Sequence, residues 1–190
     1  VRVIIYIRRQ DHLFHSLYNQ YVKWRYHCKV SCDVLADNMF SLENRRIQDF
    51  FDVSDDQQII QQIKTSFNVL SFYNIINQWS LYVGKDNVVV RIYEKDKLCQ
   101  NNIVSDFYGL FGINATPNHS LANRSLNDHY FTFLYAFNQR AINHQHSSAI
   151  RENLSKLIWE LNETDDSEIT SNSNRLSHQN RQHIVDYYAD

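Results

Sequence analysis

The spacing of apolar residues along the chain predicts many helices and two short strands. Residues 1–7, VRVIIYI, form a nearly continuous β-branched and aromatic run, which is typical of a strand buried inside a parallel sheet. A second run of this kind, NVVVRIY, covers residues 87–93. The stretch between the two runs is long enough for a crossover made of several helices. We therefore predict a helix-rich α/β fold with a partial parallel sheet of few strands, covered by helices.

Helical periodicity covers most of the remaining chain. After the first strand, Asp11 is placed to cap a helix whose apolar residues run from Leu13 to Trp24. Residues 26–40 show mixed periodicity, which is compatible with either a loop or a short helix. The polar residues 163–174 are predicted to form a mobile linker before a terminal helix. Helices are predicted over residues 41–51, 54–64, 68–82, 102–111, 126–142, 148–161 and 178–188. The helix over residues 68–82 is expected to end near Gly84.

Composition sets the scale of the fold and excludes some classes of function. With 190 residues, 43% of them hydrophobic, the chain can bury one sizeable core, so we predict a single domain. Because it starts in mid-strand and ends in a helical pattern, we interpret it as a fragment truncated at both ends. The net charge of −2 has no long single-sign run, which argues against a nucleic-acid surface. No apolar run is long enough to predict a transmembrane segment.

Two arginines at the exit of the first strand are the first candidates for binding chemistry. In open α/β sheets, ligands bind at the carboxyl ends of strands, and the planar guanidinium of Arg8 offers phosphate two parallel charged donors. Ser16 follows in the second turn of the helix, so guanidinium and hydroxyl can meet one anion. Arg9 is a weaker candidate, with an ion pair to Asp11 as its alternative. A solvated strand end and an ordinary surface hydroxyl remain the alternative for Arg8 and Ser16.

Three further features of the sequence have both a functional and a structural interpretation. Arg91, near the exit of the second strand, can contact a substrate or form a structural salt bridge. Cys28 and Cys32, next to His27, resemble half of a zinc site, but no second half follows, so we predict no metal. The odd number of cysteines argues against a disulfide framework. For His12 and His15, a surface or packing role is expected.

The first segment also resembles a known family. The pattern of a strand, Arg8, seven residues, Ser16, one residue and Tyr18 resembles the segment by which sulfotransferases hold the 3′-phosphate of the donor PAPS. The run RRQDHLFHSLYNQ is similar to bacterial sulfotransferase-like proteins associated with surface polysaccharides. Residues 72–113 resemble the family's later helix, strand and helix, where a Tyr-Glu pair follows the strand. A weaker match, NRSLNDHYFTFLYAFN, begins at Asn123, so the matches span residues 1–140.

The resemblance implies a P-loop transferase of polysaccharide biosynthesis. The complete enzyme would transfer a sulfuryl group from PAPS, its nucleotide donor, to a hydroxyl of a carbohydrate acceptor, without a metal. It implies that Arg8 and Ser16 bind the 3′-phosphate. The weaker candidates for ligand contact are Arg91, Asn123, Arg124 and Ser125. The implied location is the bacterial cytoplasm, or the Golgi lumen in a eukaryote.

The sequence departs from the family in one respect. Sulfotransferases hold the 5′-phosphosulfate with a loop of the Lys-x-Gly-Thr-Thr type. The three glycines here, Gly84, Gly109 and Gly112, do not lie between a strand and a helix in such a cradle. We therefore expect the loop and the catalytic base upstream of this fragment, which would be inactive alone. Two alternatives stay open, a non-enzymatic helical interaction or assembly module and another P-loop transferase that uses a different nucleotide.

Overall fold

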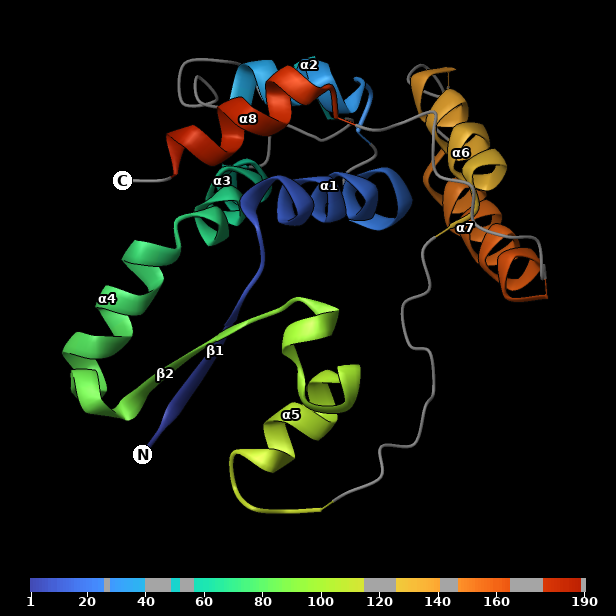
Figure 1. Ribbon diagram of the computed structural model, residues 1–190. Helices are drawn as coiled ribbons and strands as arrows, with labels where there is room; N and C mark the ends of the chain where they lie inside the picture. Colours follow the sequence, from blue (N-terminus) through green and yellow to red (C-terminus); the bar gives the residue numbers. More distant parts are fainter. Residues whose placement is uncertain are drawn as a thin grey trace.

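The computed structural model describes residues 1–25, 28–39, 49–51, 57–114, 126–140, 147–164 and 176–188. Within these ranges the chain is a helix-rich α/β structure with two parallel strands, as the sequence predicted (Figure 1). The main elements are β1 (Val3–Ile7), α1 (Gln10–Gln20), a π-helical turn (Tyr21–Arg25), α2 (Cys32–Met39), α3 (Gln57–Ser66), α4 (Phe72–Val83), β2 (Val88–Ile92), α5 (Ile103–Gly109), α6 (Asp128–Arg140), α7 (Ser147–Thr164) and α8 (His178–Tyr187).

The small sheet joins two strands that are far apart in sequence. β1 and β2 pair in parallel, from Val3 opposite Val88 to Ile7 opposite Ile92. Their β-branched side chains suit a pleated surface, and α4 and α5 lie on opposite sides of the strands (Figure 1). The prediction that both strands are fully buried is wrong, because the described part of the sheet has only two strands. Every β1 residue is half-buried, and Ile92 in β2 is 51% exposed.

The hydrophobic core lies among the helices rather than at the sheet. α1 contributes Phe14 and Tyr18, both fully buried, and α8 contributes Ile184. Full burial of a side chain of this size stabilises the fold by about 1.5–3 kcal/mol. The other buried apolar residues of this core are Tyr21, Val22, Cys28, Cys32, Leu35, Ala36, Phe50, Phe51, Ile63, Phe67, Leu70, Leu126, Phe131, Leu134, Ile158 and Leu176. This core fixes α1 in place, and with it the exit of β1.

A π-helical turn extends α1 and connects it to α6 and α7. Its wider winding leaves carbonyl groups that need partners from outside the turn. Asn138 of α6 donates its side-chain amide to the Val22 carbonyl at 2.9 Å, and the Ser155 hydroxyl of α7 lies 3.4 Å from the Lys23 carbonyl. The Lys23 ammonium lies 5.8 Å from the centre of the Trp159 ring. Burial lowers the pKa of Lys23 to about 8.

Several predicted boundaries change in the structure. α1 begins at Gln10, and Asp11 lies buried in its first turn instead of capping it. The ambiguous segment 26–40 contains the short helix α2. The helix predicted over residues 41–51 is wrong at its end, where Phe51 forms an antiparallel bridge with Cys28. The first two residues of the predicted linker 163–174 belong to α7, and the rest lie outside the described residues.

The glycine predicted to end a helix does so. α4 stops at Gly84, whose φ of +85° is in the region that favours glycine. Across the ranges that the structure describes, none of the helices has the length and apolar content that spanning a membrane requires.

Candidate functional site

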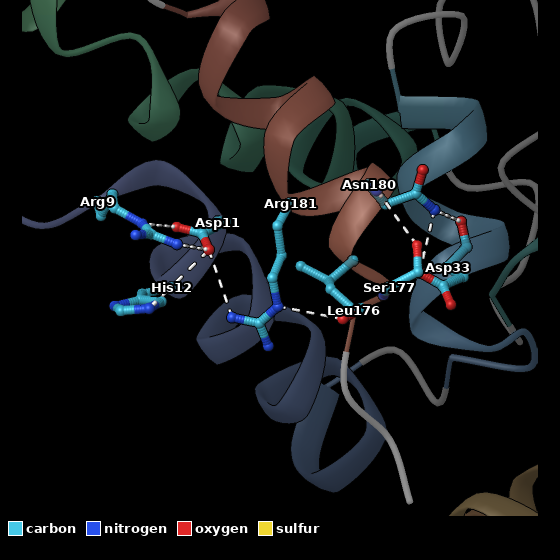
Figure 2. Close-up of polar contacts among 8 residues, drawn as sticks. All are labelled: Arg9, Asp11, His12, Asp33, Leu176, Ser177, Asn180 and Arg181. Carbon is cyan, nitrogen blue, oxygen red and sulfur yellow. Dashed lines mark hydrogen bonds and ion pairs between the residues drawn. The ribbon is translucent and has the colours of Figure 1, made fainter. Parts of the chain in front are cut away.

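Asp11 organises the exit of β1. The Arg9 Nε and Nη2 donate to the two carboxylate oxygens of Asp11 at 2.7 Å each, and Arg181 of α8 approaches the carboxylate at 3.4 Å. The His12 Nε2 lies 3.9 Å from Asp11 Oδ2 (Figure 2). The carboxylate itself is inaccessible to solvent. A buried charge is costly unless it is paired and hydrogen-bonded, so the first role of these contacts is to compensate the buried charge of Asp11.

The pKa values of Asp11 and His12 are both shifted by the charged groups around them. Burial by itself raises the pKa of Asp11, but the hydrogen bonds from Arg9 and the charge of His12 outweigh burial and bring that pKa below its usual value. The pKa of His12 is also lowered, first by burial and then by the positive charges of Arg9, Arg8 and Arg181, while Asp11 acts in the opposite direction. Three guanidinium groups therefore act on one imidazole.

The helix α8 brings Arg181 to this place. The Ser177 hydroxyl caps α8 by accepting the Asn180 N–H at 3.2 Å, and the Ser177 N–H donates to Asp33 of α2 at 2.8 Å. Asn180 donates its side-chain amide to the Asp33 carboxylate at 3.0 Å (Figure 2). The Arg181 Nε donates to the Leu176 carbonyl at 3.1 Å, which holds the guanidinium on the side of α1.

Among the described residues, Arg8 is the arginine of this group without a carboxylate partner. Its guanidinium carbon lies 5.9 Å from the centre of the Tyr93 ring, and it makes no ion pair with any residue that the structure describes. Stacking on a ring face leaves the N–H groups at the guanidinium edge available for an anion. Arg9, by contrast, uses its bidentate edge on Asp11, which is the alternative that the sequence left open for it.

Ser16 lies one helical turn beyond His12. Residues four positions apart share one side of an α-helix, so His12 and Ser16 point the same way from α1. Ser16 is half-buried. The structure thus places Arg8 and His12 in one electrostatic cluster, with the Ser16 hydroxyl on the adjacent turn.

Arg91 has a structural role. It forms a bidentate ion pair with Asp106 of α5, from Nη2 to Oδ1 at 2.5 Å and from Nε to Oδ2 at 3.0 Å. The Tyr6 hydroxyl and the Cys99 N–H also donate to Asp106, at 2.8 and 3.0 Å. The Arg91 hydrogen bonds lower the pKa of Asp106 to about 2, and burial, with the Asp106 hydrogen bond, raises the pKa of Tyr6 to about 12. Of the two roles considered for Arg91, the structure shows the salt bridge.

Among the described residues, no other candidate adds to the site. Asn123, Arg124 and Ser125 lie outside the described residues. Cys28 and Cys32 are buried, and burial raises the pKa of Cys28 to about 12, so this thiol stays protonated at neutral pH. Within the described ranges, three or more His, Cys, Asp or Glu side chains do not gather in a metal-binding arrangement.

Sequence reasoning missed the contribution of Arg181. It lies 170 positions from Asp11, and no local pattern marks it as a partner of the strand exit. The sequence predicted that Asp11 caps the helix, but the structure gives this carboxylate an ion-pairing role.

No protein-family model, curated protein or solved structure matches this chain.

Proposed function

We propose that the chain binds a phosphate-bearing ligand at the carboxyl end of β1. The observation that supports this most is the Arg8 guanidinium, which has no carboxylate partner among the described residues and lies with two other arginines around His12. Opposing them are Asp11 and Glu94, the carboxylate that acts on Arg9. Three guanidinium groups against two carboxylates leave the cluster net positive. An anion is the ligand that such a cluster favours.

The chain geometry adds to the charge. The positive end of the α1 dipole lies at the strand exit, and helix N-termini stabilise anions there. Asp11 neutralises Arg9 and fixes the loop, so Arg8 is the group that contacts the ligand. The Ser16 hydroxyl adds a neutral hydrogen bond from the next turn. A protonated His12 would add a further positive charge.

We further propose that the ligand is the donor PAPS, bound through its 3′-phosphate in a sulfotransferase-like protein. This step rests on the pattern of Arg8, Ser16 and Tyr18 in the sequence. In the reaction, a carbohydrate hydroxyl attacks sulfur in line, and the sulfuryl group leaves the 5′-phosphate of the donor. Holding the donor in position is the contribution of these residues, because positioning supplies much of the catalysis in transfers of this kind.

An assembly module is the second candidate, because α4 presents a large apolar surface. No residue of this helix is buried, and Leu81 and Tyr82 are 79% and 84% exposed. Exposed apolar patches of this kind mark interaction surfaces. This function predicts self-association or partner binding without affinity for a nucleotide.

The experiment is a calorimetric titration of adenosine 3′,5′-bisphosphate into the chain at low ionic strength. Losing a charge-assisted contact costs about 1.5–3 kcal/mol, so Arg8→Ala should weaken binding by about tenfold or more. Ser16→Ala removes a neutral hydrogen bond of about 0.5–1.5 kcal/mol and should weaken it about two- to tenfold.

Arg2→Ala is the matched control, since Arg2 is an exposed arginine at the opposite end of the same strand segment. It should leave the affinity unchanged apart from a small long-range effect. Equal losses in Arg8→Ala and Arg2→Ala would reject a localised site. Absence of binding to the folded chain would reject the proposed function and favour the assembly module.

A further inference from the structure

A shallow cavity of about 270 Å³, broadly open to solvent, lies between β1 and α5. It is lined by Tyr6 from the strand and by Ile103, Val104, Phe107 and Tyr108 from the helix. The Tyr6 hydroxyl is occupied by Asp106, so Tyr6 offers its ring to the cavity rather than a polar group. The lining is therefore apolar and aromatic.

The helical wall of this cavity is held in place from two sides. The Asn102 side chain caps α5 by accepting the N–H groups of Val104 and Ser105 at 2.8 and 3.2 Å. Asp106, on the buried side of the helix, is bound to both strands through Tyr6 and Arg91. The α5 residues that line the cavity lie at other positions around the helix, next to this anchor on Tyr6. A preformed wall of this kind lowers the cost of ordering a site when a ligand binds.

The cavity and Arg8 lie on one face of the sheet. Tyr6 pairs with Arg91 across the two strands, and both contact Asp106, which defines the α5 face. Side chains two residues apart in extended chain point the same way, at a separation of about 6.6 Å. Arg8 follows Tyr6 by two residues, and its guanidinium lies over Tyr93, which follows Arg91 by two. The anion site and the cavity are thus neighbours along the α5 face.

We infer that this cavity binds the aromatic ring system of the same ligand whose phosphate lies at Arg8, an inference that rests on the proposed function. A ring fits the volume, which is near the lower end of small-molecule pockets at about 300 Å³. Tyr6 and Phe107 supply ring faces and edges for offset or edge-to-face contact. A sugar does not fit the lining, because its hydroxyl groups would lose hydrogen bonds to water without gaining new ones.

The test compares inorganic phosphate, phenyl phosphate and 2-naphthyl phosphate by calorimetric titration into the chain. Each added ring should tighten binding, and 2-naphthyl phosphate should bind about tenfold or more tightly than inorganic phosphate, because it buries the most apolar surface. Val104→Trp fills the cavity and should remove this gain while inorganic phosphate binds as before. Leu110→Ala is the control, since Leu110 is an exposed residue that directly follows α5, lies outside the cavity lining and should leave the gain intact.

The outcomes separate the two proposals. Equal affinity for all three phosphates, each dependent on Arg8, would overturn the aromatic site and keep the anion site. Ring binding that survives Arg8→Ala unchanged would overturn the claim that one ligand spans both places. A gain that Val104→Trp leaves intact would place the ring elsewhere and overturn the inference. If no phosphate binds the folded chain, the proposed function fails, and the inference fails with it.

Discussion

Replacing Asp106 by asparagine tests the ion pair with Arg91 that joins α5 to β2 and the hydrogen bond from Tyr6 that joins it to β1. The carboxylate accepts hydrogen bonds from Arg91, Tyr6 and the Cys99 N–H, and its side chain is 1% exposed. Asparagine keeps the shape, but it loses the charge and presents an NH₂ group to donors. We expect Asp106→Asn to destabilise the fold at neutral pH.

The size of the effect follows from the pKa of Asp106. This pKa is about 2 in the folded chain, against an ordinary value of 3.8, and the difference corresponds to a contribution of about 2.5 kcal/mol at most to the free energy of unfolding. Because the Arg91 side chain is 35% exposed, solvent screens the pair, and we expect about 1–2 kcal/mol. A lowered carboxyl pKa contributes stability that is present above the unfolded value near 4 and is lost as the pH falls from about 4 towards 2.

The assay is urea unfolding of the wild type and Asp106→Asn, followed by circular dichroism at several pH values between 7 and 2.5. The stability difference should be constant above pH 5 and should narrow below pH 4. Asp86→Asn, which alters an exposed carboxylate before β2, should follow the wild type throughout. A gap that stays the same from pH 7 to pH 2.5 would refute the ion-pair reasoning.

Three further predictions concern other parts of the molecule. Asn180→Ala removes the hydrogen bonds to Asp33 and should lower the free energy of unfolding by about 1–2 kcal/mol in urea titrations. Lys23→Met should raise the thermal midpoint at pH 7, because burial disfavours the charged form of the Lys23 amine. The free energy of unfolding of the wild type should also rise between pH 8 and 10.5, because in this range Lys23 binds a proton in the unfolded chain but not in the folded one. Replacing Leu81 and Tyr82 together by serine should reduce self-association measured by light scattering.

Each of these three predictions has a matched control or an outcome that would contradict it. His178→Ala, at an exposed position of α8, should cost much less than Asn180→Ala, and equal costs would reject the docking role of Asn180. For Lys23→Met, a lower midpoint at pH 7 would show that the contact with Trp159 outweighs the cost of burying the charge. Scattering that is unchanged by the double serine variant would show that α4 is not the surface through which copies associate.

Local sequence patterns predicted the strands and many helices because their signals are short-range. Continuous β-branched runs marked β1 and β2, and Gly84 marked the end of α4. Burial of the strands was predicted wrongly, because the same runs suit a sheet with more strands than the two described here. How many strands lie beside a strand is not written in that strand's own residues.

The candidate site was predicted only in part, for a similar reason. The strand exit and Arg8 follow from local order along the chain. Arg181 reaches the site because α8 packs on α1 and α2, a contact that depends on the whole helical core. Asp11 looked like a cap, since aspartate is common at that position. In the structure, Asp11 is instead buried and forms ion pairs with Arg9 and Arg181. Arg91 likewise forms a salt bridge with Asp106, fifteen positions away, which its neighbours in sequence do not indicate.

The most direct test of an anion site at the exit of β1 is an NMR titration of the His12 imidazole against pH, with and without saturating adenosine 3′,5′-bisphosphate. In the free chain, burial and the charges of Arg9, Arg8 and Arg181 hold the pKa of His12 below its usual value, although Asp11 opposes them. A bound phosphate adds negative charge beside the imidazole, so the pKa of His12 should rise, and Arg8→Ala should greatly reduce that rise. A His12 pKa that the saturating ligand leaves unchanged would contradict an anion site at this place.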